Sequence, residues 1–153
     1  MQIFIVKSKI MKALLFIITF IWQLPQNLVA ILMLPFLGKL KLISFKKLCF
    51  AFEGENMKGG ISLGNFAFLN PRLSRDAASV AHEQEGHTHD SKLFGPLYLF
   101  VIELPSLIHA WLYDKNTCYY DFWTERRANR FANVEVVTTS GGYCYTIMKG
   151  SEN

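Results

Sequence analysis

A long uncharged apolar run comes first along the chain. Residues 13–37 carry no charged side chain, which is enough for one helical crossing of a bilayer and too short for two. Pro25, Gln26 and Asn27 interrupt the middle of the run, and a proline in a helix leaves a backbone carbonyl without its partner. The pattern therefore predicts a kinked membrane span, or a re-entrant or interfacial hairpin whose ends return to one side.

Short apolar runs rich in β-forming residues follow. Leu48–Glu53 and Ile61–Leu69 lie on either side of a polar, glycine-containing stretch, which is typical of a β-hairpin. A similar pair of runs, 134–139 and 143–148, lies around Ser140-Gly141-Gly142. This pair predicts a second hairpin near the C-terminus.

Three helical patterns lie between the two hairpins. The first is predicted to begin at Asn70-Pro71 or at Ser74 and to continue through a cluster of histidines. Gly95-Pro96 then breaks the chain, and Leu97–Tyr113 is expected to form a second, apolar helix that dips into the membrane or lies buried. A third helix is predicted to follow Asp121, a suitable N-cap residue.

These elements predict an α+β, membrane-associated protein. The expected order is an N-terminal apolar helical segment, a β-hairpin, a helix that carries a metal site, a second apolar helix, a glutamate-bearing helix and a C-terminal hairpin. Residues 1–41 would form a membrane-anchoring segment and residues 42–153 the functional domain. Met11-Lys12 would itself make a conventional start, so residues 1–10 are expected to be an upstream extension with little structural role.

Composition and charge also favour association with a membrane. The chain has 153 residues, of which 51% are apolar and 14% aromatic, and both fractions are high for a soluble protein of this size. Its formal charge of +4 includes two groups of lysines that flank the uncharged run, at positions 7, 9 and 12 and at positions 39, 41, 46 and 47. This arrangement suits anionic lipid headgroups better than a nucleic-acid groove. Membrane lipids are therefore expected partners and nucleic acid is not, while orientation and oligomeric state stay open.

Candidate chemistry is concentrated in residues 82–90, where three of the four histidines lie beside two glutamates. Zinc hydrolases commonly carry H-E-x-x-H on a helix, where histidines one turn apart bind the ion and the glutamate activates water. Here the segment reads H-E-Q-E-G-H, with one residue too many between His82 and His87. Five residues of a regular helix turn two side chains about 140° apart, so this spacing needs an explanation.

Three interpretations of the spacing are open. A π-bulge would absorb the extra residue and bring His82 and His87 to one metal ion. A regular helix would instead pair Glu83 with His87 at i,i+4 and use a carboxylate as a ligand. The same spacing would pair Glu85 with His89. In the third interpretation the cluster is an exposed polar helix face that binds no metal.

A downstream helix supplies a further ligand candidate. The run Glu125-Arg126-Arg127-Ala128-Asn129 places its first and last residues on one helix face. Together with the histidine cluster, it resembles the gluzincin group of zinc peptidases, which pair H-E-x-x-H with a downstream E-x-x-A-D-like helix. The resemblance implies that zinc is held by His82, His87 and Glu125. It also makes Glu83 the catalytic base and Asn129 the residue that orients a ligating histidine.

The run from Gly86 to Leu99 is similar to a family of small bacterial membrane proteins. Their segment reads approximately H-E-Y-G-H-x-x-Q-S-x-x-L-G-P-L-Y-L and is followed by a proline-serine pair and a later Y-T-E-x-x-A. The similarity extends from about Trp22 to Val134. This chain departs from the pattern in the inserted residue, at Gln84 or Glu85, and in Asp90, where glutamine is usual.

The expected function is hydrolysis of a peptide or protein substrate by a membrane-associated zinc metallopeptidase-like domain at 42–153. The alternative is a degenerate, non-catalytic membrane protein that keeps the scaffold and acts by binding. Glu103 is a further site candidate, because a carboxylate in an apolar stretch is costly unless it pairs or faces a wet cavity. Glu85, His89 and His109 are the remaining alternatives for the site.

The cysteines add no further motif. Cys49, Cys118 and Cys144 are odd in number and show no C-x-x-C spacing. They predict neither a disulfide framework nor a cysteine-rich zinc site. The chain also lacks a phosphate-binding glycine loop and a G-x-S-x-G nucleophile elbow.

Overall fold

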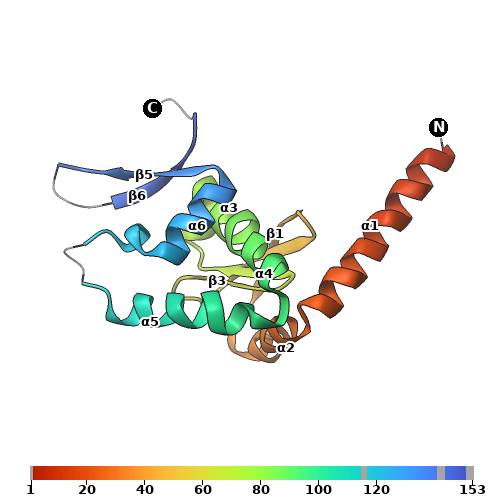
Figure 1. The fold of residues 1–153 in the computed structure, drawn as a ribbon, viewed down its shortest axis with the longest axis horizontal. Coiled ribbons are helices and arrows are strands. Elements are labelled where there is room, and N and C mark those ends of the chain that lie inside the picture. The colour runs from red at the N-terminus through yellow and green to blue at the C-terminus, as the bar shows by residue number, and fades with distance from the viewer. Residues whose placement is uncertain (1, 115–116, 141–143, 151–153) are drawn as a thin grey trace.

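The fold is α+β, as the sequence predicts, with a four-stranded sheet, a two-stranded sheet and helices packed around them (Figure 1). The computed structural model describes residues 2–114, 117–140 and 144–150, with side chains from Lys9 onward. Helix α1 projects from the body of the molecule at one end, and the two-stranded sheet lies at the other (Figure 1).

The N-terminal apolar run forms two helices, α1 (Gln2–Trp22) and α2 (Leu24–Met33), that meet at Gln23. Asn27, one of the polar residues that interrupt the run, is fully buried and is bonded to the backbone N–H and the side chain of Asn65 at 2.8 and 3.0 Å. The interruption therefore anchors the bend on the turn between two strands of the sheet.

Membrane-spanning capacity is limited in the described part of the chain. No single helix there is both long enough and apolar enough to cross a bilayer. Two pairs of helices reach the required length and composition only jointly, 9–22 with 24–36 and 77–97 with 99–112, and they are bent by 87° and 118°.

The larger sheet has the strand order β1-β2-β4-β3, so β3 is an edge strand. Its strands are β1 (Leu40–Lys46), β2 (Cys49–Gly54), β3 (Gly60–Leu63) and β4 (Phe66–Leu69). The single hairpin predicted over 48–69 is wrong. Gly64, with a φ of +66°, turns the second run back on itself to make β3 and β4. The strand β1 pairs antiparallel with β2, and the two hairpins join through a parallel β2–β4 contact.

The two faces of this sheet carry side chains of different size. Phe68 and Leu63 pack against Ala30 of α2 on one face. Ala51 and Ala67, both fully buried, lie on the other face with Val80. Because alanine side chains are short, the chain segment that follows Val80 can lie close to the sheet backbone.

The helix predicted from Asn70-Pro71 or Ser74 begins later. A 3-10 turn covers Leu73–Arg75, and Asp76 then caps α3 (Ala77–Ala81) by accepting a bond from the Ser79 N–H at 2.9 Å. A π-helical turn and α4 (Thr88–Phe94) continue the same rod. After Gly95, the second apolar segment forms a 3-10 turn, a π-helical turn and α5 (Leu104–Leu112).

The last part of the chain forms α6 (Trp123–Ala132) and the hairpin of β5 (Val134–Thr138) and β6 (Cys144–Met148). This hairpin agrees with the prediction, and the glycines expected in its turn lie outside the described residues. Asp121 is not the N-cap of α6, because it ends a 3-10 turn and Phe122 occupies the cap position.

Candidate metal centre

Residues His82–His87 form a π-helical turn. A π-helix closes its hydrogen bonds over five residues, so His82 and His87 point to the same side and their ring centroids lie 4.8 Å apart. Both side chains are buried, with 5% and 6% of their surface exposed. The widened turn therefore resolves the spacing, and the interpretation of an exposed polar face is wrong.

Gln84 explains why the turn widens here. Its amide donates to the Cys49 carbonyl at 2.8 Å and its amide oxygen accepts from the Ser44 hydroxyl at 2.7 Å, so its side chain is fixed on the sheet. Gln84 is 1% exposed. Gln84 is thus a buried anchor between the helix and strands β1 and β2, whereas Glu85 is only half-buried.

Gly86 explains how the third candidate ligand reaches the histidines. A Cβ atom at this position would overlap the backbone of Ala128, so α6 lies directly against the π-helical turn. Glu125 and Asn129 lie on the same side of α6 and are 1% and 4% exposed. The glycine therefore sets the distance between the two helices that carry the site.

His82, His87 and Glu125 form a buried group whose side-chain donor atoms all lie within 4.8 Å of one another, and this group could hold a metal ion. The carboxylate Oε2 of Glu125 lies 3.1 Å from His82 Nε2 and 3.6 Å from His87 Nε2. Donor atoms around a tetrahedral zinc ion with bonds of about 2.0–2.1 Å are separated by about 3.3 Å. Two of the donor separations lie near this value, so the group is compact enough to hold a metal ion.

The hydrogen bond of Asn129 gives an independent reason for a cation. Asn129 Oδ1 lies 2.7 Å from His82 Nδ1, and because an amide oxygen only accepts, His82 Nδ1 carries the proton. In neutral His82 the Nε2 lone pair then faces the Glu125 carboxylate at 3.1 Å. Two lone pairs at this distance require a proton or a metal ion between them.

The charges around His82, His87 and Glu125 also favour a cation at this site. Burial disfavours a charged His87, but a hydrogen bond to Glu125 and the carboxylates of Glu83 and Glu103 outweigh it and raise the pKa of His87 to about 9. Burial also opposes a charged Glu125, yet the hydrogen bonds from His82 and His87 hold its pKa well below the usual range. The buried carboxylates thus stabilise positive charge at this point.

The second oxygen of Glu125 has its own partners. Oε1 accepts from the Ser106 hydroxyl at 2.5 Å and from the Thr124 hydroxyl at 3.1 Å. These bonds fix the carboxylate so that Oε2 faces the two histidines. The sequence alone did not single out Ser106, and the Pro105-Ser106 pair is the only feature that could have drawn attention to it.

Glu83 lies beside this group and not within it. Its Oε2 accepts from the Ser62 hydroxyl at 2.6 Å, and its Oε1 side lies against Gly60, where a Cβ would overlap the carboxylate. The pairing of Glu83 with His87 as two metal ligands therefore does not occur. Ser62 lies on β3 and has no sequence signal that links it to the histidine cluster.

A cavity of about 400 Å³ opens in front of these residues. It is lined by β3, the π-helical turn, α5 and the loop before α6. Tyr119 and Tyr120 form part of its wall. The cavity gives a ligand access to the open side of the His82, His87 and Glu125 group.

Glu103 lies in the same cavity wall. It accepts a bond from the Tyr98 hydroxyl at 3.1 Å. Burial, together with the charges of Glu83 and Glu125, raises the pKa of Glu103 to about 7 against the lowering effects of His87 and Tyr98. Glu103 is therefore a carboxyl group that faces the site without belonging to the set of donor atoms.

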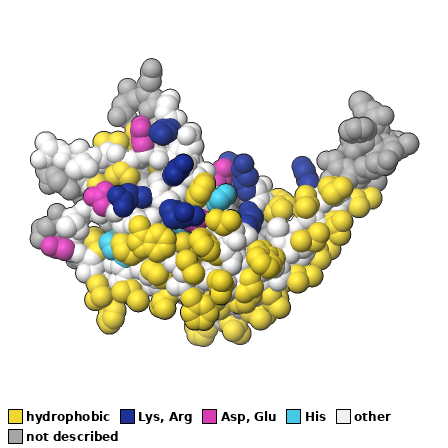
Figure 2. All heavy atoms as spheres, in the orientation of Figure 1, with side chains coloured by type: hydrophobic (Ala, Val, Ile, Leu, Met, Phe, Trp, Pro, Cys, Tyr) yellow, Lys and Arg dark blue, Asp and Glu magenta, His cyan; other side chains and the backbone are white. Residues whose placement is uncertain are grey.

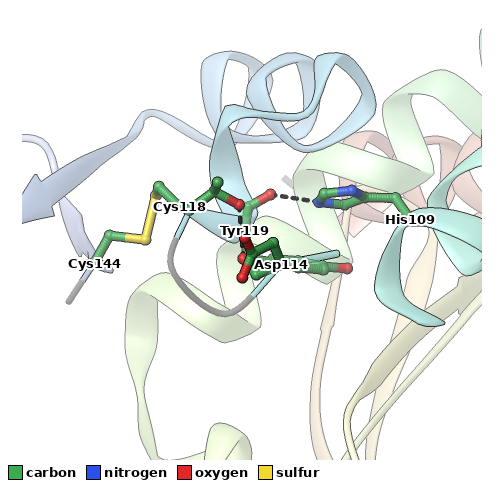
Figure 3. The surroundings of a disulfide bond; sticks show 6 residues. His109, Asp114, Cys118, Tyr119 and Cys144 are labelled. Atoms are coloured by element: carbon green, nitrogen blue, oxygen red, sulfur yellow. Dashed lines mark hydrogen bonds between the residues drawn. A yellow bond between two sulfur atoms is a disulfide. The ribbon is translucent and has the colours of Figure 1, made fainter. Parts of the chain in front are cut away.

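The remaining candidates lie elsewhere. Glu85 is half-buried and lies outside the donor group. His89 is about half exposed and its ring stacks on Phe131 at 3.7 Å. His109 Nε2 lies 2.9 Å from the Tyr119 carbonyl oxygen (Figure 3), and its ring stacks on Phe122. His89 and His109 thus pack against aromatic rings outside the donor group.

A disulfide joins Cys118 to Cys144 (Figure 3). The sequence did not predict this bond, because it connects the loop before α6 with β6, two segments whose proximity depends on the fold. Cys49 is free and buried. The bond holds the segment that carries Tyr119 and Tyr120 beside the cavity.

Comparisons with models of known protein families, with curated proteins and with solved structures found no match. Only the geometry and chemistry of the site therefore bear on its function.

Proposed function

We propose that this protein is a membrane-associated zinc metallopeptidase. The observation that carries the proposal is the convergence of His82, His87 and Glu125 beside a cavity that also contains the carboxylate of Glu83. Two imidazoles and one carboxylate are among the donor sets of catalytic zinc sites, which keep one position open. A set without cysteine also suits a site that must exchange water and substrate.

The roles of the residues follow from their positions. When bound by His82, His87 and Glu125, zinc supplies Lewis acidity that lowers the pKa of water and polarises a carbonyl. Glu83 takes a proton from the attacking water at Oε1, while Ser62 fixes Oε2. Glu83 then returns the proton to the leaving amine as the C–N bond breaks. Asn129 keeps His82 in the tautomer that offers Nε2.

Strand β3 supports an extended peptide as the substrate. It is the edge of the larger sheet, and Gly60, Ile61 and Ser62 line the cavity. An edge strand offers unpaired backbone groups that can bond to an added strand. A peptide paired with β3 would pass Glu83 and the three donor residues.

The disulfide supports a location of the domain in an oxidising compartment, because such bonds are rare in reducing cytosol. The lysine groups and the apolar N-terminal helices support attachment to an anionic membrane surface. Sedimentation after carbonate extraction tests the attachment, and full recovery in the soluble fraction without detergent would argue against an integral anchor.

Zinc analysis and the variant Glu83→Gln test the catalytic assignment. We expect one zinc per chain in the wild type and in E83Q, less zinc in His87→Ala, and cleavage of a mixed peptide library by the wild type alone. If E83Q loses zinc as severely as H87A, the assignment of Glu83 as base is wrong. Zinc retention without cleavage of any peptide would instead favour a non-catalytic protein that acts by binding.

A further inference from the structure

Helix α5 is apolar along its length, yet none of its residues is buried. Its exposed side chains recur at i, i+3, i+4, i+7 and i+8, which places them in one stripe: Leu104, Leu107, Ile108, Trp111 and Leu112. Trp111 is 85% exposed and Leu112 is 67% exposed. Exposure of such an apolar stripe to water is unfavourable, so the stripe points to a partner that covers it.

The same helix forms a wall of the cavity. Ser106, Leu107, Ala110 and Tyr113 line it. This second stripe is centred roughly 140° around the helix from the exposed one. Leu107 belongs to both stripes. Whatever covers the outer stripe of α5 therefore lies directly beside the cavity.

The covering partner has to fit a surface much larger than one helix. Figure 2 shows hydrophobic side chains gathered along the lower side of the molecule, over α5, α2 and α1, with most of the basic groups above them. The exposed large hydrophobic residues of α1 and α2 include Leu14, Leu15, Ile17, Ile18, Ile21, Trp22, Leu24, Leu28, Val29, Ile31 and Leu32. The lysines at positions 9, 12, 39 and 41 are exposed near these helices. An apolar side that extends over three helices, with basic groups beside it, matches an anionic bilayer surface better than a second protein chain.

We infer that α5 lies at the boundary between lipid headgroups and acyl chains, so that the cavity opens onto the bilayer surface. The substrates of the site are then peptide segments that lie against the membrane, next to the anchor of a membrane-bound protein. This substrate assignment rests on the proposed peptidase function. The lipid contact of α5 does not.

Lipid contact of α5 can be measured by fluorescence quenching. The full-length protein is bound to vesicles of phosphatidylcholine with about a quarter phosphatidylglycerol, with and without bromine on the acyl chains. The difference between the wild type and Trp111→Phe isolates the emission of Trp111. We expect bromolipids to quench this component. A component that bromolipids leave unquenched, while the protein is vesicle-bound, would place α5 in water and overturn the inference.

Substrate class can be measured with three forms of one probe. A mixed-sequence segment is placed directly after a single transmembrane helix of about 20 residues, after the same helix with a flexible spacer of about 40 residues and a reach of about 35 Å, or free in solution. We expect cleavage directly after the anchor to be about tenfold faster, or more, than cleavage behind the spacer. Equal rates for the three forms would overturn the substrate assignment.

Two matched variants separate surface contact from catalysis. Trp111→Glu places a charge on the outer stripe of α5, and Tyr145→Glu does so on β6, at the opposite side of the molecule. Withdrawal of one large apolar side chain from the bilayer weakens the partitioning of a protein into the membrane by roughly tenfold. W111E should therefore lose the preference for the anchored probe and keep its rate on the free peptide, whereas Y145E should keep both. A W111E variant that keeps the preference would overturn the inference.

The two proposals fail in different ways. If bromolipids quench Trp111 but no probe is cleaved, the peptidase function and its substrate assignment are wrong and the bilayer-facing cavity stands. If the free and anchored probes are cleaved equally and Trp111 is not quenched, the peptidase function stands and the bilayer-facing cavity is wrong.

Discussion

Replacement of Asn129 tests the metal centre without touching a metal ligand. In the wild type its side-chain oxygen lies 2.7 Å from His82 Nδ1, and both side chains are buried. Asn129→Ala removes this acceptor and leaves a buried N–H without a partner, which costs about 1–3 kcal/mol of folding stability. It also frees the imidazole to change tautomer. Loss of such an orienting partner typically weakens metal affinity by about 10- to 100-fold, or about 1.4–2.7 kcal/mol.

Asn129→Asp should act in the opposite direction on metal affinity. The side-chain nitrogen of Asn129 is buried and has no hydrogen-bond partner among the described residues, so its replacement by oxygen removes no bond. A carboxylate would strengthen the bond to His82 and raise the basicity of Nε2. It would also add negative charge beside Glu125, which destabilises the metal-free protein. N129D should therefore bind zinc at least as tightly as the wild type and depend more on zinc for its stability.

Competition with a chromophoric chelator gives the zinc affinity of each variant, and thermal unfolding with and without zinc gives the stability. Arg130→Ala, an exposed position on the same helix, is the control and should leave zinc affinity unchanged. If N129A stays folded and binds zinc within a factor of about two of the wild type, below the effect of an orienting partner, then Asn129 does not orient a ligand. That result would also remove the argument for His82 Nε2 as a donor.

Three further predictions concern the elements that build the site. Deletion of Glu85 restores H-E-x-G-H and should keep zinc binding, because a π-bulge takes up one residue without changing the phase of the flanking helices. Deletion of Gln84 should lower the melting temperature more than deletion of Glu85, since it removes the bonds to Ser44 and Cys49. Equal loss of zinc binding in the two deletion variants would contradict this prediction. Gly86→Ala should destabilise the fold by about 1–3 kcal/mol and weaken zinc binding, because its Cβ would overlap the Ala128 backbone. The control Gly59→Ala, whose Cβ meets open space, should change neither stability nor zinc binding. Serine at both Cys118 and Cys144 should lower the free energy of unfolding by about 2–4 kcal/mol, and an unchanged denaturant midpoint would mean that the bond does not stabilise the fold.

The sequence predicts the elements that depend on local pattern. The apolar helices, the Glu125 helix and the C-terminal hairpin all follow from hydrophobic periodicity and turn residues, and the predicted interruption at Pro25, Gln26 and Asn27 lies just after the actual bend at Gln23. Helix starts were less accurate, because Asp76 and Phe122 take the cap positions only after 3-10 turns that leave no clear pattern. Local signals thus define which elements exist better than where they begin.

The sequence did not predict which segments that lie far apart along the chain pair with each other. The parallel contact of β2 with β4 depends on the turn at Gly64, and the disulfide depends on where β6 folds back. The same limit applies within the site. The histidine spacing permits a π-helical turn and two other arrangements, and only the anchoring of Gln84 on the sheet distinguishes them. Ser62 and Tyr120 reach the cavity from segments with no metal-site motif.

The disulfide also bears on the order in which the protein is completed during synthesis. Protein synthesis releases the N-terminal part of a chain first, so α1 and α2 leave the ribosome before Glu125 exists. Two histidines alone are an incomplete donor group, and the loop before α6 is linked to β6 only once Cys144 has emerged and an oxidant has acted. A nascent chain therefore carries its two apolar N-terminal helices well before its three donor residues are complete and the disulfide can close.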